Sequence, residues 1–279
     1  MQESSGSPTH LRWLLLVGAL LNFLAGVQLF VLGDQSLRWF AWTLTPAAGG
    51  GALGAFSWAA AATLLLAWAE HAWSGVRALV PGGFAFAALA LAASVAGFGH
   101  LHWLAPAAGG VITAAWLLSV SLAIPAWILI ALLNEEHWRD DPHPGRHHSL
   151  PLLLIVAFLT AVALVIGSLL FVAGAGRVWP WPLDRLTAQV TGAWLVAAGV
   201  TGLAILVERG SARTRAPFAG LALVGALLLL ALLRFHTAPA HPLRLVGYVA
   251  AALMAVAAGY AGLRRGLTDP RPSAAPFVR

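Results

Sequence analysis

Two residue types are missing from this sequence, which contains no cysteine and no lysine. Without cysteine, the chain cannot form disulfides, hold iron–sulfur clusters or use a thiol nucleophile. Without lysine, a retinal Schiff base and a P-loop are excluded, because each requires the amine. Charged residues are also scarce, at 9% of 279 residues, whereas 60% of the residues are hydrophobic. This balance is typical of a membrane protein and not of a soluble domain.

Eight apolar runs are long enough to cross a hydrocarbon layer of about 30 Å. Proline and glycine interrupt the sequence at nearly every break between these runs. The first run resembles a signal peptide in composition, but it has crossing length and its end matches the end of an internal run, so we retain it as a helix. The sequence therefore predicts an all-α polytopic membrane protein with eight transmembrane helices, at residues 11–32, 52–69, 82–104, 111–133, 150–173, 188–207, 218–236 and 243–263.

The segment at residues 54–70, GAFSWAAAATLLLAWAE, returns without a gap at residues 192–208 as GAWLVAAGVTGLAILVE. Thr63 and Thr201 are among the identical positions, and flanking motifs such as LFVLG and LFVAG recur as well. We interpret the chain as two copies of one ancestral four-helix unit. Because four crossings are an even number, both copies insert the same way up. This predicts two parallel four-helix repeats, placed as side-by-side bundles about a pseudo-two-fold axis along the membrane normal.

The arginines indicate the orientation. Eleven of them fall on the side of the two termini and five on the other side. The positive-inside bias then places both termini on the cytoplasmic side of a bacterial plasma membrane. The expected partners are the lipid bilayer and other membrane subunits, and the charge pattern requires no nucleic acid. The expected units are a disordered tail at 1–10, a first repeat at 11–133, a cytoplasmic linker at 134–149, a second repeat at 150–265 and a cytoplasmic tail at 266–279.

Histidines near the outer ends of the third and seventh predicted helices form the first candidate site. His100 and His236 fall at corresponding positions of the two repeats. They could face each other as axial ligands of a haem, or bind a divalent metal ion together with His102 and His241. In the alternative interpretation, both imidazoles lie at the membrane interface and reach water.

The hydrophilic linker is a second candidate metal site. His137, His143, His147 and His148 lie there among acidic residues, and such nitrogen and oxygen donors suit a divalent cation. The spacing fits no zinc signature, and a charged connector between two membrane bundles would have the same composition.

The repeated Glu70 and Glu208 each precede an arginine by seven residues, at Arg77 and Arg215. Seven residues are two helical turns, so each pair could share one helix face only if the helix continued beyond the membrane. We expect helix-end charges with a structural role.

The tryptophans of the predicted outer loops, RWFAWTLTP and RVWPWPLDR, include Trp42 and Trp181. Tryptophan collects at the level of the lipid headgroups, so these residues are expected in an aromatic belt. A lid over an outward-facing pocket is the alternative.

The central parts of the predicted helices contain no ionisable residue, which disfavours an ion-coupled pump. No familiar motif of a membrane hydrolase or transferase is present either, and the chain is expected to have no catalytic activity. Three functions stay open. The first is an accessory or structural subunit of a membrane complex. The second is a facilitator for a small neutral solute, lined by Thr63 and Thr201. The third is a haem- or metal-binding redox protein that uses His100 and His236.

Overall fold

The computed structural model describes residues 9–70, 76–103, 109–133, 149–173, 178–207, 215–235 and 239–268. This part of the chain is helical and contains no strand. Eight of its helices are long and apolar enough to cross a membrane, which confirms the predicted number. They are α1 (Thr9–Gly26, continued by the π-helical turn Val27–Val31), α3 (Ala47–Glu70), α5 (Val80–Ala96), α6 (Gly109–Leu133), α8 (Leu150–Ala173), α9 (Arg185–Val207), α10 (Arg215–Phe235) and α11 (Pro242–Thr268).

The largest differences from the predicted boundaries lie at three helix ends, and one of them is the end of α11, which runs five residues past the prediction to Thr268. Helix α3 begins five residues early, at Ala47, and runs through three successive glycines. The glycines pack closely against leucine side chains, since a Cβ at Gly49 would lie 2.9 Å from Leu183 Cδ2 and one at Gly50 would lie 2.9 Å from Leu44 Cδ1. Helix α5 ends early, at Ala96, where Gly97 leaves the helical conformation.

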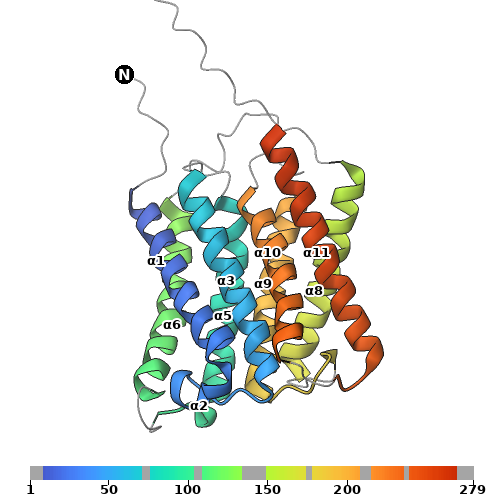
Figure 1. Ribbon diagram of the computed structural model, residues 1–279. Helices are drawn as coiled ribbons and strands as arrows, with labels where there is room; N and C mark the ends of the chain where they lie inside the picture. The colour runs from blue at the N-terminus through green and yellow to red at the C-terminus, as the bar shows by residue number, and fades with distance from the viewer. Residues whose placement is uncertain are drawn as a thin grey trace, which may run out of the picture.

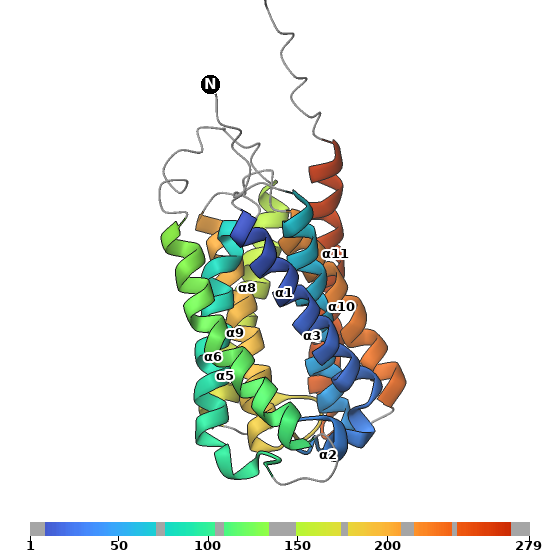
Figure 2. The ribbon, with the colours of Figure 1, turned by 90° about the vertical axis from the view of Figure 1, so that its left-hand side faces the viewer.

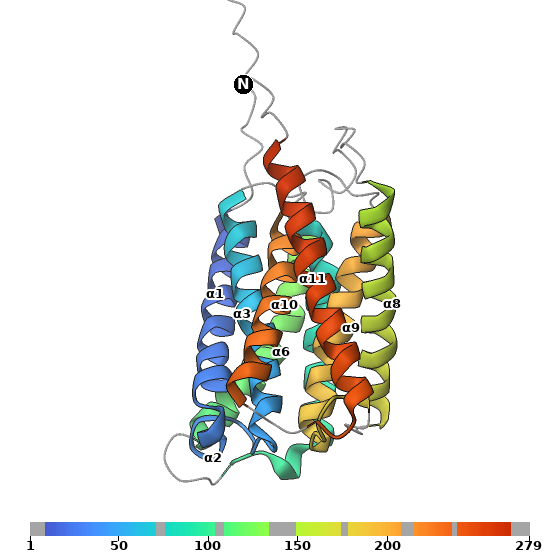
Figure 3. The same cartoon turned by 45° about the vertical axis from the view of Figure 1, so that its right-hand side comes forward.

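The helices form two layers of four. One layer has the neighbour order α1, α3, α10, α11, and the other has the order α6, α5, α9, α8. The layers face each other in Figure 2 and meet where α3 contacts α9, with further contacts of α1 with α6 and of α11 with α8 at the two edges. Figure 3 shows α11 between α10 and α8.

Each layer combines helices from both halves of the chain. The hairpin of α1 and α3 packs against α10, and the hairpin of α8 and α9 packs against α5. The arrangement therefore differs from the expected pair of bundles made of consecutive helices. Thr63 of α3 packs against Gly220 of α10, so helices of the two halves of the chain meet closely at this crossing.

The two ends of the molecule differ in what they hold. Helix α1 begins and α11 ends at one end, which we call the terminal end (Figure 1). The opposite end, which we call the aromatic end, holds the segments at residues 36–46 and 178–184 (Figure 1). At the aromatic end, the short helix α2 (Ser36–Trp39) and the 3₁₀ turn η4 (Phe98–His100) lie between the long helices.

Candidate functional site

His102 holds two loops together at the aromatic end. Its Nδ1 lies 3.1 Å from the carbonyl oxygen of Phe40, and its Nε2 lies 2.9 Å from Thr43 Oγ1. A carbonyl can only accept, so Nδ1 carries the proton and Nε2 accepts from the threonine hydroxyl. The backbone N–H of His102 also donates to the carbonyl oxygen of Ala41 at 2.8 Å. Both ring nitrogens are therefore engaged, and His102 could bind a metal ion only after losing a hydrogen bond.

The other histidines of the proposed pair and metal set are not assembled into a site within the described residues. His100 lies in the η4 turn, beyond the end of α5, and is exposed rather than inside a crossing. His241 is exposed as well, and its Nδ1 accepts the N–H of Leu243 at 3.3 Å, at the start of α11. No group of three or more His, Asp or Glu side chains that could hold a metal ion occurs in the described ranges. His236 lies outside the described residues, as do the linker histidines His137, His143, His147 and His148.

The repeated threonines pack against glycines. Thr63 of α3 is buried, and its hydroxyl donates to the carbonyl oxygen of Ala59 at 2.8 Å. A Cβ at Gly220 of α10 would overlap Thr63 Oγ1, and a Cβ at Gly82 of α5 would overlap Thr201 Oγ1 of α9. The two threonines thus fill notches at helix crossings.

Trp42 is one of three aromatic residues whose rings form a cluster at the aromatic end. Its ring lies 4.5 Å from that of Phe40 and 5.4 Å from that of Trp116 on α6. The indole N–H of Trp42 donates to Thr187 Oγ1 of α9 at 3.0 Å. The backbone N–H of Thr187 in turn donates to Asp184 Oδ1 at 2.9 Å, which fixes the first turn of α9. This chain of contacts joins the two layers.

A second aromatic cluster contains Trp181. Trp179 and Trp181 each lie 5.4 Å from Tyr248 of α11, in edge-to-face arrangements. The Tyr248 hydroxyl donates to the carbonyl oxygen of Leu228 on α10 at 3.1 Å. Unlike Trp42, the buried indole nitrogens of Trp179 and Trp181 have no hydrogen-bond partner among the described residues.

The expected aromatic belt is corrected at these positions. Trp42 and Trp181 are each 1% exposed, so their rings face the protein core and not the lipid. Trp39 lies in the same loop as Trp42 but is 39% exposed. The segments at residues 36–46 and 178–184 therefore close the aromatic end of the helix layers with buried rings.

The two repeated glutamates lie at or beyond the limits of the described residues. Glu70 is the last residue of α3, and Arg77 begins the 3₁₀ turn Arg77–Leu79 that precedes α5. Residues 71–75, between the two, lie outside the described residues. Glu208 lies outside the described residues, so the pairing of the repeated glutamates with arginines stays a prediction.

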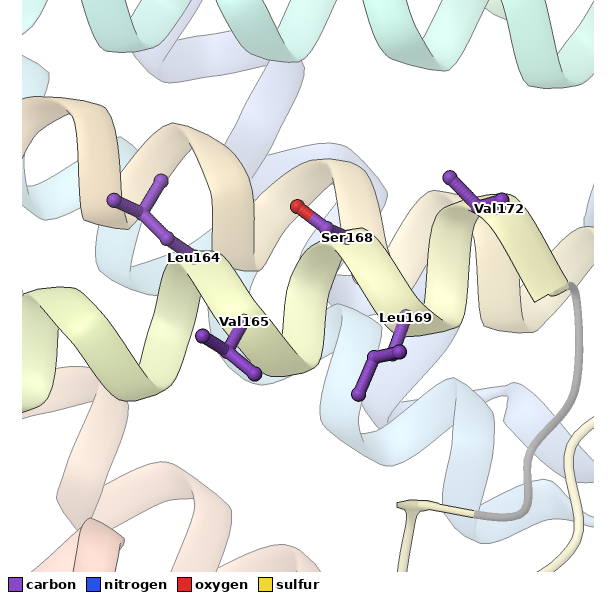
Figure 4. A pocket seen from close by; sticks show the side chains of 5 residues that line it. All are labelled: Leu164, Val165, Ser168, Leu169 and Val172. Atoms are coloured by element: carbon purple, nitrogen blue, oxygen red, sulfur yellow. The ribbon is translucent and has the colours of Figure 1, made fainter.

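A shallow groove follows the outer face of α8 (Figure 4). It has a volume of ≈ 500 Å³ and is lined by Leu164, Val165, Ser168, Leu169 and Val172. All five residues belong to α8, and four are apolar. This groove offers one hydroxyl and no ionisable group, which suits contact with a lipid chain and not chemistry.

Sequence reasoning missed three residues that organise the aromatic end, namely Thr187, Trp116 and Tyr248. The alternating aromatic residues at 40–42 and 179–181 signal that a cluster exists, but they do not say which helix completes it. Thr187 lies 145 positions from Trp42 in the sequence, and nothing local links them.

Fold and packing together define a class, that of helical multi-pass membrane proteins. No family model, no curated protein and no solved structure matches the chain.

Proposed function

We propose that this protein is a non-catalytic accessory or structural subunit of a bacterial plasma-membrane complex. The observation that carries the proposal is the use of three of its buried hydroxyl groups. The Thr63, Ser57 and Ser94 hydroxyls each donate to a carbonyl of the preceding turn of their own helix, at 2.8 to 3.0 Å. A hydroxyl that is bonded within its own helix is already satisfied there and offers little polarity to a substrate.

The facilitator alternative has less support from these contacts. It requires Thr63 and Thr201 to line a solute pathway, whereas each of them fills a glycine notch. The redox alternative rests on His100, which lies exposed at the aromatic end.

The proposed building plan is a duplicated four-helix unit. Support comes from contacts that occur once in each copy. The sequence offset that relates Gly54 to Gly192 also relates Thr63 to Thr201 and Gly82 to Gly220. The contact of Thr63 with Gly220 is therefore equivalent to the contact of Thr201 with Gly82. Phe56 and Trp194 are equivalent positions, and their rings stack on each other at 6.0 Å with 8° between their planes, as residues beside a two-fold axis would.

We place the terminal end in the cytoplasm. The ends of the described chain lie there together (Figure 1), and the sequence assigns eleven of the sixteen arginines to that side. Labelling of single cysteines introduced into the cysteine-free chain tests this placement in intact cells.

The test of the accessory role is extraction of the tagged protein from its native membrane into polymer-bounded discs, followed by quantitative identification of co-isolated proteins. A different membrane polypeptide in fixed stoichiometry, retained through a high-salt wash, is the expected result. The protein alone, with solute flux after reconstitution into liposomes, would overturn the accessory role. A visible spectrum of the same sample tests the redox alternative, which requires a haem band that is lost in His100→Ala but kept in His241→Ala.

A further inference from the structure

One apolar cluster lies at the terminal end, where several of the crossing helices begin or end. We call it the terminal cluster, and its buried members include Leu11 of α1, Ala67 of α3, Val80 of α5, Ile130 of α6 and Ala216 of α10. Three half-buried arginines each adjoin a buried member of this cluster in the sequence, namely Arg12, Arg77 and Arg215. Positive charge is therefore concentrated around the terminal cluster.

The contacts of Arg12 fix one side of its guanidinium. Its Cζ lies 5.3 Å from the centre of the Trp68 ring on α3, within the range of a cation–π interaction. Trp68 in turn packs against the terminal cluster. The Nε of Arg12 is buried and has no hydrogen-bond partner among the described residues. Because Arg12 as a whole is only half-buried, its side chain is still open to a group from outside the protein.

Acidic residues are not concentrated at this end in the same way. The described ranges hold three of them, and two, Asp34 and Asp184, lie in or next to the segments of the aromatic end. The third is Glu70, two positions beyond Trp68 on α3. Successive positions of an α-helix are turned by about 100°, so positions 68 and 70 lie on nearly opposite sides of the helix. The charge of Arg12 beside Trp68 therefore suits an anion from outside the described residues.

The depth of Arg12 and the side chains that follow it favour a phospholipid as the source of this anion. Arg12 is the second residue of the apolar span that starts at Leu11, so it lies near the level of the lipid headgroups. Leu16, Leu20 and Phe23 follow it at helical spacing on the same side of α1. Leu20 and Phe23 are 57% and 52% exposed, which leaves them open to acyl chains. A free anion would make no use of this apolar row.

We propose that the terminal end binds the phosphate of an anionic phospholipid through Arg12, with Trp68 orienting the guanidinium. A guanidinium presents parallel N–H donors that match two phosphate oxygens. Arg77 and Arg215 add positive charge around the same cluster, which favours a headgroup of net negative charge over one that carries an ammonium group. The site uses only this chain and a lipid, so the inference does not depend on the proposed accessory role.

Lipid titration of the purified full chain, followed by native mass spectrometry, tests the site. We expect the parent to bind phosphatidylglycerol in preference to phosphatidylcholine with the same acyl chains. Arg12→Ala should weaken phosphatidylglycerol binding by about tenfold, because charge-assisted hydrogen bonds to the phosphate are lost. The matched control is Arg264→Ala on α11, since Arg264 also lies over an aromatic ring, 5.5 Å from the centre of Tyr260, but is exposed. It removes the same charge from the terminal end and should bind the lipid as the parent does.

A second variant separates the guanidinium from its charge. Arg12→Lys keeps the positive charge and an apolar stem, so the fold should be preserved. We expect its lipid binding to fall below that of the parent, because an ammonium lacks the planar fork that stacks on Trp68. Parent-like binding by this variant would overturn the role given to Trp68.

Three further outcomes would overturn the lipid site itself. They are parent-like binding by Arg12→Ala, an equal loss in Arg264→Ala, and the absence of any preference for phosphatidylglycerol in the parent. Inorganic phosphate in excess should leave the lipid bound, because it lacks the acyl chains that contact α1. Displacement of the lipid by inorganic phosphate would instead identify a site for free anions and contradict the proposal.

Discussion

At the scale of single residues, glycines determine how closely the hairpins approach. Gly220 admits the Thr63 side chain at the crossing of α3 and α10, and Gly82 admits Thr201 at the crossing of α5 and α9. In lipid, helices gain no hydrophobic energy by meeting, so close contact between small residues contributes a large share of their association. These two crossings join the halves of the chain.

We expect Gly220→Ala to lower the free energy of unfolding by about 1–3 kcal/mol, because the new methyl group overpacks against Thr63 Oγ1. Adding Thr63→Ala in the same chain should restore most of the loss, since the overlapping atom is removed. At the second crossing, Thr201→Ala should rescue Gly82→Ala less completely, because a Cβ at Gly82 also lies 2.7 Å from the backbone carbonyl of Ala197. Unfolding in mixed micelles of increasing denaturing detergent measures all four variants.

The matched control is Gly247→Ala on α11, where no atom lies within 4 Å of the added methyl group. Alanine favours a helix over glycine by about 0.5–1 kcal/mol, so this variant should be slightly more stable than the parent. If Gly220→Ala behaved like Gly247→Ala, the glycine notch would not be a determinant of packing.

The repeated threonines could be found from the sequence, but their role could not. Identity between the two copies identifies Thr63 and Thr201 as constrained positions. Their glycine partners lie on helices of the opposite half, and the sequence gives no indication of that pairing. The tryptophans show a similar limit, because an amphipathic ring suits a lipid interface and a protein core equally well.

At the scale of elements, the segment preceding α3 is fixed by hydrogen bonds to its neighbours. Ser36 Oγ accepts the backbone N–H of Leu44 at 3.0 Å, which closes the loop on itself. His102 bonds to the same loop from the segment after α5, and Thr113 Oγ1 of α6 donates to the Ala41 carbonyl at 3.3 Å. This loop is therefore held both by a hydrogen bond of its own and by hydrogen bonds to residues after α5 and on α6.

We expect His102→Ala to loosen this loop. Loss of the imidazole leaves the Phe40 carbonyl and the Thr43 hydroxyl without the partners they have in the parent protein. The result should be faster hydrogen–deuterium exchange in the peptide covering residues 36–46, measured by mass spectrometry in lipid discs. His100→Ala is the control, since His100 is exposed and two residues away. Equal exchange in the two variants would contradict a bracing role for His102.

The elements themselves were largely predictable. Helix α8 spans the predicted residues 150–173 at both ends, because an uninterrupted apolar run leaves little freedom in placing it. One of the larger errors falls at the terminal end, where α11 runs on to Thr268. The other two fall at the aromatic end, where α3 starts early and α5 stops early. Glycines caused both, since a glycine inside a close-packed helix and a glycine at a helix end look the same in sequence.

At the scale of the whole molecule, the two layers make the halves of the chain depend on each other. Helices α1 and α3 share a layer with α10 and α11, and α5 and α6 share one with α9 and α8. Hydropathy predicts that each helix crosses the membrane, but all eight are apolar around most of their circumference. Such helices carry little information about which of them become neighbours, and the interleaved order therefore could not be predicted.

Interleaving leads to a prediction about the divided chain. If the chain is cut within residues 134–148 and each half is expressed alone, α3 loses its neighbour α10 and α9 loses its neighbour α5, so both halves should be degraded or aggregate. Expressed together, the halves should assemble and co-purify through a tag on one of them. Introducing Gly220→Ala into the second half should reduce this assembly, and Gly247→Ala should not. Two halves that were each stable alone would instead indicate independent bundles, because a unit that buries its own helix faces needs no partner.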